Sequence, residues 1–160
     1  MWIRQARLPQ RFGGCGLRNS VRTSFAAFWA SWADSLPVIA ERYPALGQRI
    51  YALITDLSLP TTPHFIRAIR SSSQFLADHG WIEQPTWDMV YDGVRPPQPD
   101  PHKLDCGEWA HGWQYHGNNA LEFNKRNNLL RRLAFPRIRR NARASGKARL
   151  YSASGPFNTA

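Results

Sequence analysis

The chain has 160 residues and a formal net charge of +10, with 21 Lys and Arg against 11 Asp and Glu. This is the length of one domain, and 42% hydrophobic residues, including 7 tryptophans, are enough for a packed core. Apolar runs fall short of the roughly 20 residues that cross a bilayer. Two cysteines make no disulfide framework, so we expect neither a membrane protein nor a disulfide-rich scaffold.

The positive charge is concentrated at the two ends of the chain. Residues 1–22 carry five arginines and no acid, and residues 123–160 carry ten basic residues and no acid. Residues 23–122 carry six basic and eleven acidic residues, a net charge of −5. An acidic middle between two basic ends predicts that the ends bind a polyanion.

The N-terminal segment contains a glycine cluster, Gly13, Gly14 and Gly16, flanked by Arg11 and Arg18. It lacks the lysine of a Walker loop, and it lacks the strand and the third glycine of a dinucleotide-binding fingerprint. We therefore predict a tight turn in which glycine adopts a positive φ angle. Exposed N–H groups beside the two arginines can still contact a phosphate backbone.

Apolar residues then recur at helical spacing as far as residue 79. Asn19 or Ser20 can cap a first helix. Pro37 should end this helix or open the next one as its first residue. Trp29 and Trp32 on this helix, like Trp109 and Trp113 further on, are expected in the core. The predicted helices span residues 20–36, 38–42, 46–57 and 63–79, with one more short helical turn after Pro85.

The C-terminal third begins with a proline-rich connector. Asp105 and Glu108 have the spacing of a capping box, which predicts a further helix. The alternation typical of β-strands is not found. The expected fold is mostly α, with a small helical domain (1–93), a Pro-rich linker (94–105), a Trp-bearing helix (106–123) and a basic, partly disordered tail (124–160).

The candidate catalytic and metal-binding residues do not form a known pattern. His102, Cys106, His111 and His116 are close in sequence, but their spacing matches no zinc motif. Cys15 and the serines lack a recognisable nucleophile context, and the acids are spread as loop and cap residues are. We predict no catalytic residues, no metal and no cofactor, and therefore no enzyme.

The basic residues are the main candidate site, because so many like charges repel one another unless an anion neutralises them. Phosphates of RNA or DNA fit this role, and Phe135 and Tyr151 can stack on unpaired bases. A solvated tail or a nuclear localisation signal remains an alternative. The predicted contacts are Arg11, Arg18, Arg131, Arg132, Arg137, Arg139, Arg140, Arg143, Lys147 and Arg149, with the turn at Gly13, Gly14 and Gly16.

The sequence favours a nuclear or cytoplasmic location. Up to Asp34, however, the chain has arginines, serines and alanines but no acid, as organelle transit peptides do. Pro9 and the glycine cluster interrupt a presequence helix. An organelle location is therefore the alternative, while the preference for RNA or DNA and the oligomeric state stay open.

Four phrases, in order, resemble the region downstream of the reverse transcriptase domain in non-LTR retrotransposon polyproteins. They are RLPQRFGGCGLRNSVRTSFAAFWASWADSLPVI, PTWDMVYDGVRPP, GEWAHGWQ and LYSASGP. The resemblance implies a helical thumb-and-linker segment that helps to hold template and primer. The catalytic aspartates of that family lie upstream in a [FY]xDD motif, and Tyr91-Asp92-Gly93 lacks the second aspartate.

The expected function is therefore non-catalytic, largely sequence-independent binding of nucleic-acid backbone by a retroelement-derived fragment. Two alternatives remain open. One is a degenerate transposon fragment with no selected function, and the other is an organelle-targeted structural or ribosome-associated basic protein.

Overall fold

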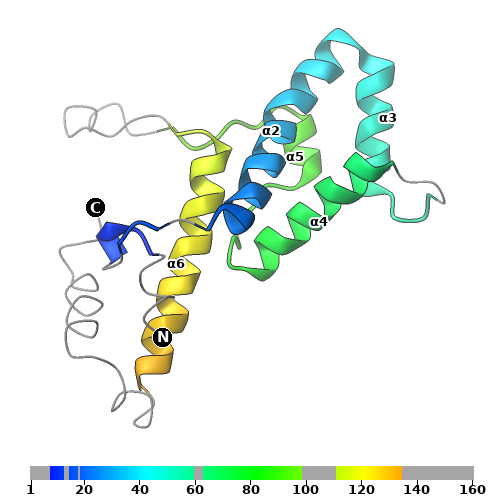
Figure 1. The fold of residues 1–160 in the computed structure, drawn as a ribbon. Coiled ribbons are helices and arrows are strands. Elements are labelled where there is room, and N and C mark those ends of the chain that lie inside the picture. Colours follow the sequence, from blue (N-terminus) through cyan, green and yellow to red (C-terminus); the bar gives the residue numbers. More distant parts are fainter. Residues whose placement is uncertain (1–7, 13–14, 18, 60–62, 99–110, 135–160) are drawn as a thin grey trace. The chain divides into compact units, whose positions relative to one another are not determined.

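The structure is a computed structural model that describes residues 8–12, 15–17, 19–59, 63–98 and 111–134. All regular elements within these ranges are helices, which confirms the mostly α fold (Figure 1). No helix in them is long and apolar enough to span a membrane. The elements are η1 (Gln10–Phe12), α2 (Ser20–Arg42), α3 (Pro44–Thr55), α4 (His64–Asp78), α5 (Trp87–Tyr91) and α6 (Trp113–Ala134).

The chain divides into two compact units. Unit 1 comprises residues 1–23 and 119–160, and unit 2 comprises residues 24–118. The N-terminal segment therefore groups with the C-terminal part of the chain. The boundaries fall inside α2 and α6, so each of these two helices contributes residues to both units.

Helix α2 continues through Pro37, where the sequence predicts a break. Proline has no N–H to donate to the carbonyl four residues earlier, which normally destabilises a helix interior. Packing on both sides of the proline accounts for the continuation. Leu36 is fully buried before it, and Ala40 lies against Gly47 of α3 after it. The short helix predicted over residues 38–42 is therefore the end of α2.

Helices α2 and α3 form a close hairpin with Tyr43 as the single residue between them (Figure 1). Pro44 occupies the first turn of α3, where a proline loses no helical hydrogen bond. A Cβ atom on Gly47 would lie 2.5 Å from the Cα atom of Ala40. The hairpin therefore needs a glycine at position 47. Helix α3 also starts two residues earlier than the sequence predicts, at Pro44.

Trp29 of α2 lies at the centre of the core of unit 2. Its ring centroid is 4.9 Å from that of Trp81, 5.4 Å from Trp87 and 6.0 Å from Trp113. With the Gln84 amide oriented to satisfy both of its ends, the indole N–H of Trp29 donates to Gln84 Oε1 at 2.9 Å. Burial of Trp29 and Trp113 confirms their assignment to the core.

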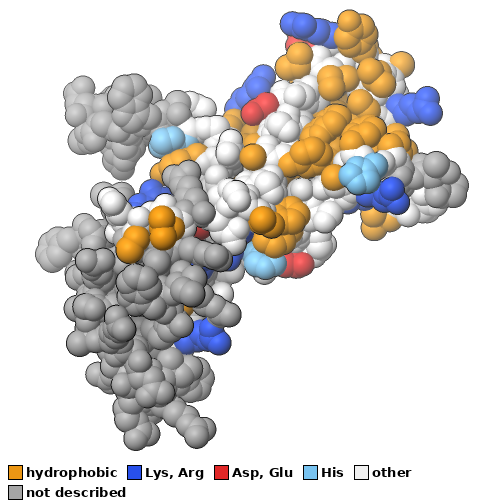
Figure 2. Space-filling model, viewed as in Figure 1, with side chains coloured by type: hydrophobic (Ala, Val, Ile, Leu, Met, Phe, Trp, Pro, Cys, Tyr) orange, Lys and Arg blue, Asp and Glu red, His pale blue; other side chains and the backbone are white. Residues whose placement is uncertain are grey.

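The buried face of α2 consists mainly of small side chains rather than aromatic ones. Alanines fill it between Trp29 and Leu36, while Trp32 is only half-buried and stacks on Phe65 of α4 at 5.2 Å. Small side chains there let neighbouring helices approach closely. On the face shown in Figure 2, hydrophobic side chains gather over α3 and its neighbours in unit 2, where Tyr43 and Leu46 are exposed.

The remaining helices follow the sequence in type but not always in extent. The short helix after Pro85 is α5, and Thr86 caps it by accepting from the Met89 N–H at 3.3 Å. The helix predicted over residues 106–123 is wrong in its bounds. His111 and Gly112 are not helical, and α6 runs from Trp113 to Ala134. The first eleven residues assigned to the tail are helical, while the proposed capping box at Asp105 and Glu108 lies outside the described residues.

Candidate nucleic-acid interface

Unit 1 contains both basic ends of the chain. Residues 1–23 and 119–160 together carry fifteen Lys and Arg and one acid, a net charge of +14. Residues 24–118 carry six basic and ten acidic residues, a net charge of −4, which gives the total of +10. The tertiary grouping therefore places the two basic segments, which lie at opposite ends of the sequence, in one unit.

A small apolar contact holds the N-terminal segment within unit 1. Leu8 is fully buried against Leu129 of α6, and Phe12 and Leu130 pack around this pair. The backbone then turns back, with the Gly16 N–H donating to the Leu8 carbonyl at 2.9 Å. Gly16 has a φ angle of +74°, a conformation that glycine adopts without the strain of a Cβ atom.

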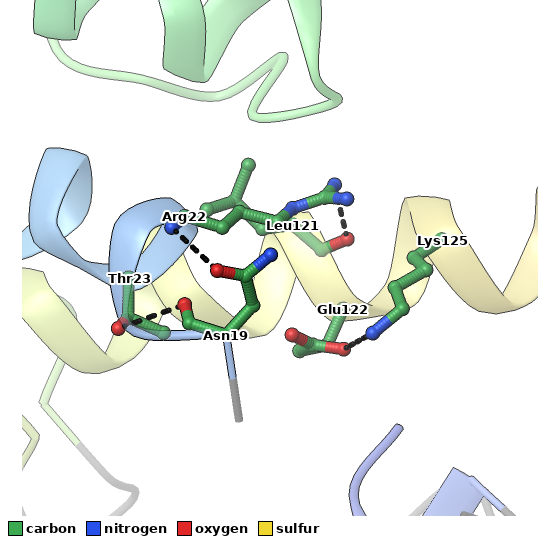
Figure 3. Close-up of polar contacts among 6 residues, drawn as sticks. All are labelled: Asn19, Arg22, Thr23, Leu121, Glu122 and Lys125. Atoms are coloured by element: carbon green, nitrogen blue, oxygen red, sulfur yellow. Dashed lines mark hydrogen bonds and ion pairs between the residues drawn. The ribbon is translucent and has the colours of Figure 1, made fainter. Parts of the chain in front are cut away.

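Asn19, one of the two caps that the sequence offers, caps the start of α2. Its carbonyl oxygen accepts the backbone N–H groups of Arg22 and Thr23, each at 3.0 Å. Its side-chain Oδ1 accepts a longer bond from the Arg22 N–H at 3.4 Å (Figure 3). These contacts satisfy backbone N–H groups in the first turn of α2, which have no partner within the helix.

Arg22 is a structural cation rather than a surface one. Its Nη2 donates to the Leu121 carbonyl at 3.1 Å, as Figure 3 shows. Burial lowers the pKa of Arg22, and the negative charge of Glu122 opposes this shift. A guanidinium that supports a helix carbonyl from a half-buried position is poorly placed for a solvent phosphate.

The acid of unit 1 is already paired. Glu122 is buried, and its Oε2 lies 3.4 Å from Lys125 Nζ (Figure 3). The two residues are three positions apart on α6, a spacing that places their side chains side by side. One carboxylate with its own lysine leaves the other cations of unit 1 in excess over acid.

The structure places three of the ten predicted binding residues. Arg11 lies exposed in η1 and donates from Nη2 to Asn119 Oδ1. Arg131 and Arg132 are exposed in the last turn of α6. The other predicted residues lie outside the described part: Arg18, Arg137, Arg139, Arg140, Arg143, Lys147 and Arg149, together with Gly13 and Gly14 of the turn and the stacking candidates Phe135 and Tyr151.

Arg131 and Arg132 also have a role within α6 that is independent of any ligand. Cations in the last turn of a helix interact favourably with its unpaired carbonyls, typically by about 0.3–1 kcal/mol. This interaction accounts for their position on α6. It does not use up their hydrogen-bonding capacity, because each guanidinium has five N–H donors and both side chains face solvent.

Sequence reasoning missed a group of residues that the fold brings together around Phe12. The Phe12 and Phe123 ring centroids are 6.3 Å apart at an interplanar angle of 63°. The guanidinium of Arg126 lies 5.4 Å from the centroid of Phe12 and 5.9 Å from that of Phe123. The spacing of three between Phe123 and Arg126 on a helix was the one available signal, whereas Phe12 joins them only through the fold.

The candidate metal ligands do not assemble among the described residues, which contain no cluster of three His, Cys, Asp or Glu side chains. His111 instead stacks on Tyr115 at 3.6 Å, and His116 lies edge-on to Trp113. Burial lowers the pKa of His116, and the charge of His111 lowers it further. His102 and Cys106 lie outside the described residues.

Comparison with known proteins identifies no relative. No protein-family model matches the chain, and no curated protein or solved structure is significantly similar to it. The charge and geometry of unit 1 therefore carry the functional assignment.

Proposed function

We propose that this protein binds the phosphate backbone of nucleic acid through unit 1, without catalysis and largely without sequence specificity. The observation that carries the proposal is the gathering of both basic ends into one unit whose single acid, Glu122, is paired with Lys125. Excess cations in one unit attract a polyanion and release its counterions on binding. Unit 2 has a net charge of −4 and is not assigned to this contact.

The cations assigned to this contact are the exposed ones in the described part of unit 1, Arg11, Arg131 and Arg132, together with the arginines and lysines that follow α6 in sequence. Arg22 is excluded because its guanidinium supports the Leu121 carbonyl from a half-buried position. The proposal thus separates structural from binding cations within one unit.

A salt series tests the proposal directly. Binding of a labelled 20-base-pair DNA duplex and of a 20-nucleotide RNA is measured by fluorescence anisotropy from 50 to 300 mM KCl. If about half of the ten C-terminal cations contact phosphates, log K falls against log salt with a slope of about −4.5 on duplex DNA. Weak binding without a salt slope contradicts the proposal and favours a fragment with no selected function.

A charge-matched pair of variants separates this contact from the net charge of the chain. Replacement of Arg131, Arg132, Arg139 and Arg140 by alanine should remove about 3.6 from the slope if all four contact phosphates. Replacement of the exposed unit 2 residues Arg42, Arg49, Arg67 and Arg95 removes the same charge and should leave the slope unchanged. Equal effects of the two sets contradict binding through unit 1.

We further propose that the chain derives from a retroelement reverse transcriptase, on the four phrases that resemble that family. The neighbouring reading frame tests this ancestry, which requires an upstream [FY]xDD polymerase motif and a downstream zinc motif.

N-terminal sequencing of the protein recovered from cells distinguishes a nuclear or cytoplasmic protein from an organelle one. A shortened N-terminus that begins after residue 20 would reveal a cleaved presequence.

A further inference from the structure

We propose that Phe123 of α6 is a stacking site for one unpaired base, so that single-stranded nucleic acid is the preferred ligand of unit 1. The proposal rests on the nucleic-acid binding proposed above and adds the strand class to it. It is argued from four residues, Arg11, Phe12, Phe123 and Arg126, here called the aromatic–arginine cluster.

Phe123 is an exposed aromatic residue of α6. Its exposed fraction is 50%, although phenylalanine is among the residue types that are most often buried. Phe12 meets it edge-on, at 6.3 Å and 63°. Because Phe12 also packs against the buried Leu8 and Leu129 pair, the position of the edge contact is fixed.

Two guanidinium groups surround these rings. Arg126 lies over both, at 5.4 Å from the centroid of Phe12 and 5.9 Å from that of Phe123, and Arg11 lies 5.0 Å from the centroid of Phe12. Arg11 is oriented by its hydrogen bond to Asn119. An aromatic ring with cations beside it matches a nucleotide, in which a flat base adjoins a charged phosphate.

The geometry of α6 extends this match. At about 100° per residue, Arg131 lies about 80° around the helix from Phe123, whereas Arg132 lies on the opposite side. Phe123 and Arg131 are about 12 Å apart along the helix axis, at 1.5 Å per residue. A strand whose base stacks on Phe123 therefore meets a further cation on the same side of α6.

Single strands are the favoured ligand because a duplex does not expose the faces of its bases. In a duplex the bases are stacked on one another and their faces are covered, so a flat aromatic side chain on a helix surface cannot reach them. In a single strand every base offers a face, and the ring accepts any base. Duplex binding then relies on the phosphate contacts alone.

The test compares strands and variants by anisotropy at 100 mM KCl, with (U)20 RNA, (dT)20 DNA and a 20-base-pair duplex as probes. Phe123→Leu keeps apolar bulk but removes the ring, and it should weaken binding to both single strands about tenfold while leaving duplex affinity within twofold. Tyr43→Leu, an exposed aromatic of unit 2, is the matched control and should change nothing. Phe123→Trp should restore single-strand affinity.

Each outcome decides between the two proposals. If the wild-type chain binds neither single strand nor duplex, both proposals fail. If it binds with a steep salt slope but Phe123→Leu leaves single-strand affinity unchanged, or weakens all three probes alike, only the stacking site is overturned. A photochemical test without substitution uses (U)20 carrying 5-iodouracil, whose cross-link should map to Phe123, and a cross-link confined to other residues overturns the proposal.

Discussion

The side chain of Arg70, on α4, caps carbonyl groups at the C-terminal end of α3. Its Nη2 donates to the Leu53 and Asp56 carbonyls, each at 2.5 Å, and its Nε donates to the Ile54 carbonyl at 3.2 Å. These carbonyls lie at the C-terminal end of α3, where no helical N–H remains to pair with them. An arginine of α4 thus replaces the usual C-terminal cap and joins the two helices.

Arg70→Met should lower the free energy of unfolding by about 1.5–3 kcal/mol, because hydrogen bonds from a charged donor are lost while the aliphatic stem remains. Arg67→Met on the same helix removes an exposed arginine and should change it by less than about 0.5 kcal/mol. Urea denaturation followed by circular dichroism measures both. Equal midpoints for the two variants would show that the carbonyl contacts contribute nothing.

Gly47 is required by backbone proximity rather than by conformation. An added Cβ atom would lie 2.5 Å from the Ala40 Cα atom and 2.9 Å from its Cβ atom, and backbone cannot move aside as a flexible side chain can. We expect Gly47→Ala to cost about 1–3 kcal/mol of stability, even though alanine is the better helix former. Gln48→Ala, at the exposed next position, serves as the control, and a stabilised Gly47→Ala protein would contradict the close approach.

His116 should make stability depend on pH in the weakly acidic range. Its pKa is lowered by burial first and by His111 second, so the folded chain binds this proton less tightly than the unfolded chain. Unfolding therefore takes up a proton, and stability should fall as the pH drops through about 6.5, the usual histidine pKa. Above that value the histidine is neutral in both states, and its contribution is constant.

The measurement compares the free energy of unfolding of the wild type and His116→Gln at pH 5.5 and pH 7.5. The variant should lose part of the difference between the two pH values, whereas His64→Gln, at an exposed position, should retain it. An unchanged pH dependence in His116→Gln would show that another group is responsible.

At the scale of elements, α2 is the clearest case of packing overriding a local signal. Pro37 lies inside the helix, where a proline costs about 3 kcal/mol relative to alanine. Leu36 and the contact between Ala40 and Gly47 retain the helix on either side. The helix survives because the tertiary contacts of both halves outweigh one missing hydrogen bond.

Pro37→Ala should therefore stabilise the protein, by about 1–2 kcal/mol once the greater freedom of the unfolded chain is allowed for. The expected sign is opposite to that of most substitutions. Thermal unfolding followed at 222 nm measures it, with Ala27→Gly in the same helix as a destabilising reference. A lower melting temperature for Pro37→Ala would mean that the proline itself shapes the packing of α2.

The bounds of α6 differ from the predicted ones, again because tertiary packing outweighs a local signal. The sequence locates an N-terminal boundary by a capping pattern, but the described helix begins at Trp113, whose ring packs against Trp29. Its extension to Ala134 follows from Leu121 and Leu129, which are both buried. Basic residues alone gave no signal for these last turns, because Lys and Arg suit an exposed helix and a tail equally well.

At the scale of the whole molecule, the concentration of positive charge in unit 1 should lower the stability of the fold. Unit 1 carries a net charge of +14, and like charges in a compact unit repel one another. Salt screens this repulsion, with a Debye length of about 10 Å at 0.1 M. Raising NaCl from 20 to 300 mM should therefore raise the melting temperature, by about 2–4 °C for each kcal/mol gained. A variant with Arg131, Arg132, Arg139 and Arg140 replaced by alanine should respond less, and an equal or larger response would contradict the argument.

The sequence by itself determined the helical class, a cap at Asn19 or Ser20, the short helix after Pro85 and the excess of positive charge at both ends. These features depend on local spacing, on capping chemistry and on composition, all of which can be read along the chain. Only the tertiary structure decided that the two basic ends belong to one unit, that Arg22 is structural, and that Phe12 meets Phe123 and Arg126. Such pairings join residues 99 or more positions apart, and they depend on which apolar faces pack together, which no local pattern encodes.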